Sequence, residues 1–91
     1  MHELSLMKSL MRKVDEVADR EGAGRVLGVK VWLGALSHFS PSHFEEHFVQ
    51  AATGTRAEGA RLDCVLSDDI GHPHAQDVLI ESVLVDRDGQ G

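Results

Sequence analysis

The first three residues of the chain, Met1, His2 and Glu3, carry the groups best suited to chemistry. A free terminal amine, the next backbone nitrogen and the His2 imidazole can close consecutive chelate rings around a metal that accepts square-planar nitrogen ligands, as Ni(II) and Cu(II) do. Glu3 can add a carboxylate oxygen or its amide nitrogen. An ordinary terminal amine has a pKa of about 7.7–8.0 and an imidazole about 6.5, so metal must displace protons and affinity should fall in mild acid. We therefore predict a metal site here if Met1 is retained and unblocked, against the simpler interpretation of a mobile chain end.

A second candidate lies in the middle of the chain, where His43 and His47 are four residues apart. On a helix this spacing places both imidazoles on the same side, where they could hold one metal, with His38 in the preceding loop as a third candidate. The segment superficially resembles a metalloprotease helix, but Phe44 stands where the catalytic glutamate should follow the first histidine. We therefore do not predict a hydrolase, and two bystander histidines remain the simpler interpretation.

A third candidate is the polar loop 67–76, which contains His72 and His74 close to Asp68 and Asp69. Polar loops commonly collect such residues without binding metal, and adjacent aspartates often cap turns. We find no serine in a nucleophile elbow and no glycine-rich phosphate loop with a lysine. The sequence therefore predicts a protein without catalytic activity.

Charge and cysteine content narrow the function further. The formal net charge of −6 over 91 residues opposes binding to a phosphate backbone, so nucleic acid is not expected as a partner. The one cysteine, Cys64, cannot form a disulfide within the chain or supply the two Cys-x-x-Cys pairs of a structural zinc site. Apolar runs are too short to span a membrane, and Glu3 lies where a signal peptide would be basic, so we expect a cytoplasmic protein with no membrane partner.

Five elements are expected to position these groups. Apolar residues recur at helical spacing from Leu4 to about Arg20, and the glycines at 22 and 24 end that helix. A second helix starts with Ser40 or Ser42 as its cap and ends near Gly54. Alternation or β-branched residues predict strands over 26–33, 60–66 and 78–85.

The order of these elements predicts an α+β fold in a single small domain, 1–91, with two helices packed on one face of a three-stranded mixed sheet. We expect the last two strands to be antiparallel across the loop 67–76, and residues 86–91 to form a flexible tail. Cys64 should point inward with Leu62 and Leu66, as a core residue and not a nucleophile. Trp32 falls on the polar face of its strand, as a partner anchor or buried beneath a helix. The core is modest, so homodimerisation could supplement stability.

Several segments, taken in order, resemble the HypA/HybF family of nickel metallochaperones for [NiFe]-hydrogenase maturation. The similarity covers about residues 1–66 and resumes near the end of the chain. Its segments are Met1-His2-Glu3-Leu4-Ser5-Leu6, Val31-Trp32-Leu33-Gly34-Ala35-Leu36-Ser37, Ala57-Glu58-Gly59-Ala60 and Leu79-Ile80-Glu81-Ser82-Val83-Leu84-Val85.

The resemblance implies that His2 is a nickel ligand, with the Met1 amine and Glu3 beside it, and that Ni(II) is bound transiently. It implies two partners, the maturation GTPase and the hydrogenase large-subunit precursor. The chain departs from the family where the loop 67–76 replaces a zinc lobe, and where Ser40 and Ala35 stand in place of acidic residues. No structural zinc is therefore expected. A degenerate relative that works as a non-metal adaptor in hydrogenase assembly is the alternative.

Overall fold

The computed structural model describes residues 2–86, with side chains from Ser5 onward. All five predicted elements are present, and their ends lie within two residues of the expected ones. Neither helix has the length and apolarity needed to cross a bilayer. The end of the predicted tail, 87–91, lies outside the described residues, whereas Asp86 belongs to the last strand. The elements are α1 (His2–Arg20), β1 (Arg25–Leu33), α2 (Pro41–Ala52), β2 (Arg61–Leu66) and β3 (Val78–Asp86).

The three strands form one mixed sheet in the order β2-β1-β3. β1 pairs with β2 in parallel, which α2 makes possible as the crossover connection, and with β3 antiparallel. The expected pairing of the last two strands with each other is wrong. β2 and β3 do run in opposite directions, but they flank β1 on its two edges, so the most buried strand takes the centre of the sheet.

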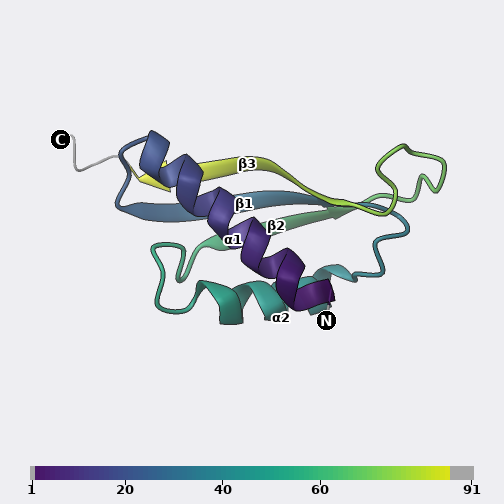
Figure 1. The fold of residues 1–91 in the computed structure, drawn as a ribbon, viewed down its shortest axis with the longest axis horizontal. Coiled ribbons are helices and arrows are strands. Elements are labelled where there is room, and N and C mark those ends of the chain that lie inside the picture. The colour runs from purple at the N-terminus through teal and green to yellow at the C-terminus, as the bar shows by residue number, and fades with distance from the viewer. Residues whose placement is uncertain (1, 87–91) are drawn as a thin grey trace.

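Both helices lie against the same face of the sheet, as predicted (Figure 1). α1 crosses β1 and β3, while α2 packs against β2 and the start of α1. The inward residues of β1 alternate, with Val29, Val31 and Leu33 almost completely buried. Leu66, expected to face inward, is 50% exposed because it ends an edge strand that α2 covers only in part. The largest fully buried side chains are Phe44, Phe48, Leu33, Val14, Val26 and Val31.

The opposite face of the sheet has no helix over it. Trp32 lies on this face, in register with Val65 of β2 and Leu79 of β3, and it is half-buried. Its ring meets the imidazole of His72, with ring centroids 4.8 Å apart. Of the two interpretations of Trp32, burial under a helix is therefore wrong. The Trp32 ring is covered instead by His72, from the loop between β2 and β3.

α2 begins where its sequence allows a cap and a proline together. Ser40 has an extended backbone, and its side-chain oxygen accepts a hydrogen bond from the His43 backbone N–H at 3.2 Å. Pro41 occupies the first helical position, where its missing N–H costs nothing. Of the two serines considered, Ser40 is thus the cap, and this fixes the first turn of α2.

The loop that joins β2 to β3 packs closely against the end of β1. The Gly34 backbone N–H donates to the Asp77 carbonyl at 2.9 Å, and the Leu36 N–H donates to the Ala75 carbonyl at 2.7 Å. Gly34 has no space for a side chain, because a Cβ there would lie 2.2 Å from the Ala75 carbonyl oxygen. Ala75 itself is 5% exposed. This approach of two backbones fixes the position of both loops.

Replacing Gly34 by alanine should therefore destabilise the protein by about 1–3 kcal/mol, the range for forcing extra atoms into a packed site. The obstacle is backbone, which cannot rotate away as a side chain would. Urea unfolding followed by circular dichroism measures the loss. Gly24→Ala is the matched control, since a Cβ at Gly24 meets nothing within 4 Å. Equal stabilities of the two variants would contradict the packing argument.

Candidate functional site

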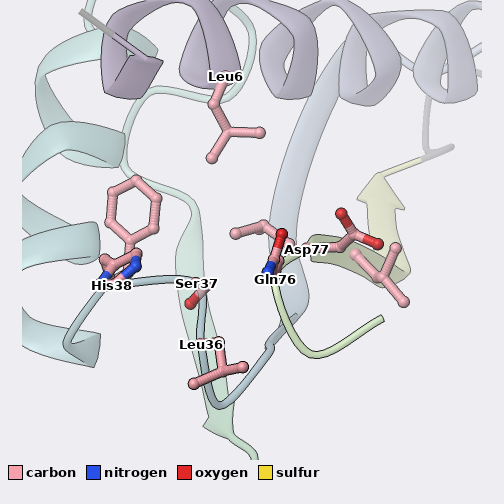
Figure 2. A pocket seen from close by; sticks show the side chains of 9 residues that line it. Leu6, Leu36, Ser37, His38, Gln76 and Asp77 are labelled. Carbon is pink, nitrogen blue, oxygen red and sulfur yellow. The ribbon is translucent and has the colours of Figure 1, made fainter. Parts of the chain in front are cut away.

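A cavity of about 710 Å³ lies where the first turns of α1 meet the ends of the sheet (Figure 2). Leu6 of α1 covers one side, the loop after β1 contributes Ser37 to Phe39, and the start of β3 contributes the opposite wall. Segments far apart in the chain therefore meet beside the N-terminal end of α1. The lining residues are Leu6, Leu36, Ser37, His38, Phe39, Gln76, Asp77, Val78 and Leu79.

Three polar groups of this cavity are potential ligands or hydrogen-bond partners. The Ser37 hydroxyl oxygen is buried and has no hydrogen-bond partner among the residues that the structure describes. His38 has φ of 68°, a left-handed conformation that few residues other than glycine adopt. The Asp77 carboxylate pairs with the His74 Nδ1 at 2.8 Å. His38 was among the candidates predicted from the sequence, whereas Ser37 and Asp77 were not. The one available signal was the three-residue spacing between His74 and Asp77.

The predicted metal ligands Met1, His2 and Glu3 lie outside the residues whose side chains the structure describes. The backbone of α1 is described from His2 onward. The helix thus begins two residues before the predicted Leu4. The first N–H groups of any helix have no partner within it, so they remain available to other groups. Backbone nitrogen near His2 is therefore not committed to the hydrogen bonds of α1.

The two histidines of α2 lie together, as their spacing predicts. The Nε2 atoms of His43 and His47 are 3.0 Å apart, and the two ring centroids are 4.6 Å apart. His38 does not join them. Over the described part of the chain, no three His, Cys, Asp or Glu side chains are grouped so that they could hold a metal.

The loop histidines do not form the predicted cluster with Asp68 and Asp69. His74 pairs with Asp77 instead, while the His72 Nδ1 accepts a hydrogen bond from the His74 backbone N–H at 3.0 Å. Asp69 accepts a hydrogen bond from the Gly71 N–H and so closes a turn, as the simpler interpretation of the aspartate pair predicted. This loop stabilises itself and covers Trp32, and it gathers no metal ligands of its own.

Cys64 is only half-buried, less than predicted, because β2 is an edge strand. Its burial still raises the pKa of the thiol to about 11, and the negative charges of Glu45 and Asp63 add to this. The reactive thiolate is therefore scarce at neutral pH. This agrees with the prediction that Cys64 is not a nucleophile.

Alkylation of Cys64 by iodoacetamide at pH 8 should be about 100-fold slower in the folded than in the unfolded protein, because only the thiolate reacts. Because the pKa of the thiol is raised from 9.0 to about 11, the thiol is still protonated at pH 8, and the alkylation rate should rise with pH until about pH 11. Mass spectrometry of timed samples measures it. A rate that levels off below pH 9 would refute the assignment.

Comparison with known proteins identifies the family. A sequence model described as "Hydrogenase/urease nickel incorporation, metallochaperone, hypA" matches residues 1–70. The chain belongs to the HypA family. A HypA relative from Chlorobium limicola, named a hydrogenase maturation factor, is 46% identical over 63 residues, which cover 69% of this chain and 54% of that protein. The hydrogenase maturation factor HypA of Methylocella silvestris is 40% identical over 63 residues, covering 69% of this chain and 56% of that protein.

The HypA fold is also recognisable in solved structures. The solution structure of the Ni metallochaperone HypA from Helicobacter pylori superposes with a TM-score of 0.75, covering 91% of this chain and 96% of that one. Its sequence identity of 19% makes this a likeness of fold alone. The chain spans about half the length of the curated HypA relatives it matches. The shared part begins at residue 1 and therefore includes the Met1, His2 and Glu3 segment.

Proposed function

We propose that this protein is a nickel metallochaperone, which holds Ni(II) transiently at Met1, His2 and Glu3 and passes it on during maturation of a [NiFe]-hydrogenase. The observation that carries this proposal is the match of the nickel-incorporation family over residues 1–70, which contain the chelating tripeptide. The ligands are the terminal amine, the backbone nitrogen and imidazole of His2, and a Glu3 oxygen or nitrogen. Its role is delivery and not catalysis.

The position of α1 supports transfer. A site of few protein ligands leaves coordination positions open to a docking protein, whereas a closed cage of protein ligands would hold its metal. The cavity beside the first turns of α1 brings His38 and Asp77 to the same end of the molecule. Either side chain could complete the coordination when the tripeptide holds nickel, in place of the acidic residues that Ser40 and Ala35 have replaced.

We infer further that the loop Ser67–Gln76 takes the place of the zinc lobe of the family, so that the chain carries no structural zinc of that kind. The loop closes on its own hydrogen bonds, from the His72 N–H to the Asp69 carbonyl and from the Ala75 N–H to the His72 carbonyl. It is anchored at Gly34 through contacts that the backbone itself makes.

The partners that this role requires are the nickel-binding GTPase of hydrogenase maturation and the precursor of the hydrogenase large subunit. Both are proposed from the family membership. The open sheet face offers apolar contacts for a protein partner through Val65 and Leu79, on either side of the half-buried Trp32. Tryptophan is the residue type most enriched among strong binding contacts.

Complementation tests the proposal. A hydrogenase-producing strain that lacks its own HypA should recover hydrogenase activity when it expresses this protein, and should not recover it with the His2→Ala variant. Immunoblots must show equal amounts of both proteins. If the variant restores activity equally well, the non-metal adaptor is the correct function. If neither does so, even with added nickel, a role in hydrogenase maturation is refuted.

A further inference from the structure

The paired imidazoles of His43 and His47 on α2 have the geometry of a second metal site. Two nitrogen ligands at about 2.0–2.1 Å from one metal lie about 2.9 Å apart when they subtend 90°, and about 3.3 Å apart in a tetrahedron. The observed Nε2 to Nε2 distance is 3.0 Å. The two lone pairs can therefore converge on one ion with little movement of either ring.

The helix holds this pair in place. Phe44 and Phe48, each next to one of the histidines in sequence, are 0% and 1% exposed and fix the rotation of α2 about its axis. The His43 backbone is itself pinned by the cap, through its hydrogen bond to Ser40. A preorganised pair loses less entropy on binding than two mobile side chains. The His43 ring also lies 6.5 Å from that of Phe39, which lines the cavity beside α1.

We propose that His43 and His47 form an open, two-imidazole site for a late first-row divalent ion, with Ni(II) and Cu(II) favoured over Zn(II). Imidazole suits these metals, and the 3.0 Å separation lies nearer the 90° arrangement of Ni(II) and Cu(II) than the tetrahedron of zinc. The described residues add no third His, Cys, Asp or Glu ligand, so the other positions fall to groups outside that set, such as water. This inference goes beyond the proposed function and does not depend on it.

Binding requires one rearrangement of protons. In the metal-free protein, the short contact is a hydrogen bond in which one ring carries its proton on Nε2 and the other accepts it. A metal needs both Nε2 lone pairs, so the donating ring must carry its proton on Nδ1. The exchange is a change of tautomer, with no net release of a proton.

The test uses tag-free protein with the His2→Ala substitution, which removes the imidazole of the N-terminal chelate. Equilibrium dialysis with Ni(II) should detect one ion per chain. The His43→Gln and His47→Gln variants should each bind at least about 10-fold more weakly, since even loss of an outer-shell partner costs metal sites 10- to 100-fold. His72→Gln, which removes a histidine outside the pair, should leave binding unchanged.

The decisive control keeps the number of histidines on α2 constant. In the double variant His47→Gln/Gln50→His, the imidazoles are seven residues apart, about 10 Å along the helix, and cannot share a metal. It should bind as weakly as His47→Gln. Circular dichroism must show unchanged helix content. Absence of bound Ni(II), or unchanged binding by the double variant, would overturn the proposal. Because the N-terminal site is disabled throughout, either result leaves the proposed function standing.

A second measurement needs no substitution on α2. Paramagnetic Cu(II), added in substoichiometric amounts to the same His2→Ala protein, should broaden the ring signals of His43 and His47 before those of other histidines in the NMR spectrum. Broadening that begins instead at His72, His74 or His38 would refute the pair as the site.

Discussion

Acetylation of the Met1 amine is expected to lower Ni(II) affinity at the N-terminal site by at least about 100-fold, which corresponds to about 2.7 kcal/mol. Acetylation turns the amine, one end of the chelate with the His2 imidazole, into a weakly basic amide. His2→Ala should have an effect of the same size, because it removes the other end of the chelate. Calorimetric titration with Ni(II) at pH 7.5 measures both losses.

The titration is performed in a His47→Gln background, so that the imidazole pair on α2 does not contribute. Mass spectrometry must first show that Met1 is present and unmodified. Affinity should also fall as the pH is lowered from 8 to 6, because protons compete for both nitrogen ligands. His72→Ala serves as the control, since that ring packs on Trp32 on the face of the sheet opposite the helices. Nickel binding that survives both the acetylation and His2→Ala would remove the chemical basis of the proposed function.

Replacing Phe44 by alanine is expected to destabilise the protein by about 3–5 kcal/mol, the usual cost of deleting a buried aromatic ring. Phe44 is completely buried and meets Phe39 edge to face, with ring centroids 5.3 Å apart. Domains of this size have total stabilities of about 5–15 kcal/mol, so the variant should be close to unfolding at 37 °C. The loss should extend to metal binding, because Phe44 holds α2 and Phe39 lines the cavity.

Urea unfolding followed by Trp32 fluorescence and circular dichroism measures this loss. Val49→Ala on the same helix is the matched control, since Val49 is 56% exposed and surface substitutions change stability by about 0.5 kcal/mol or less. Phe44→Leu should recover most of the stability. A loss below about 1 kcal/mol for Phe44→Ala would mean that α2 is not anchored through this ring.

The folded protein shows where sequence patterns suffice. Helical periodicity predicted α1 and alternation predicted β1, and the ends of each lie within two residues of the predicted ones. Both patterns depend only on residues close together in the chain. The sequence also predicted that His43 and His47 lie on the same side of their helix, because a helix has 3.6 residues per turn. The proposed chelating tripeptide is likewise a property of three consecutive residues.

The pairing of strands was the part that the sequence did not predict. A ten-residue polar loop between two strands suggests a hairpin, yet β3 passes β2 and pairs with β1. Strand partners are chosen by packing over the whole sheet, and the most buried strand gains most from lying between two others. The cavity shares this origin, because Leu6, His38 and Asp77 meet only through the docking of three distant segments.

The sequence by itself determined the elements, the single cysteine, the acidic charge and the tripeptide that we propose as the chelate, since each resides in composition or in residues close together. Only the tertiary structure decided the strand order, the cavity at the start of α1, the pairing of His74 with Asp77 and the 3.0 Å separation of the His43 and His47 nitrogens. These depend on contacts between residues far apart in the chain and on the rotamers that packing permits, which local patterns do not encode.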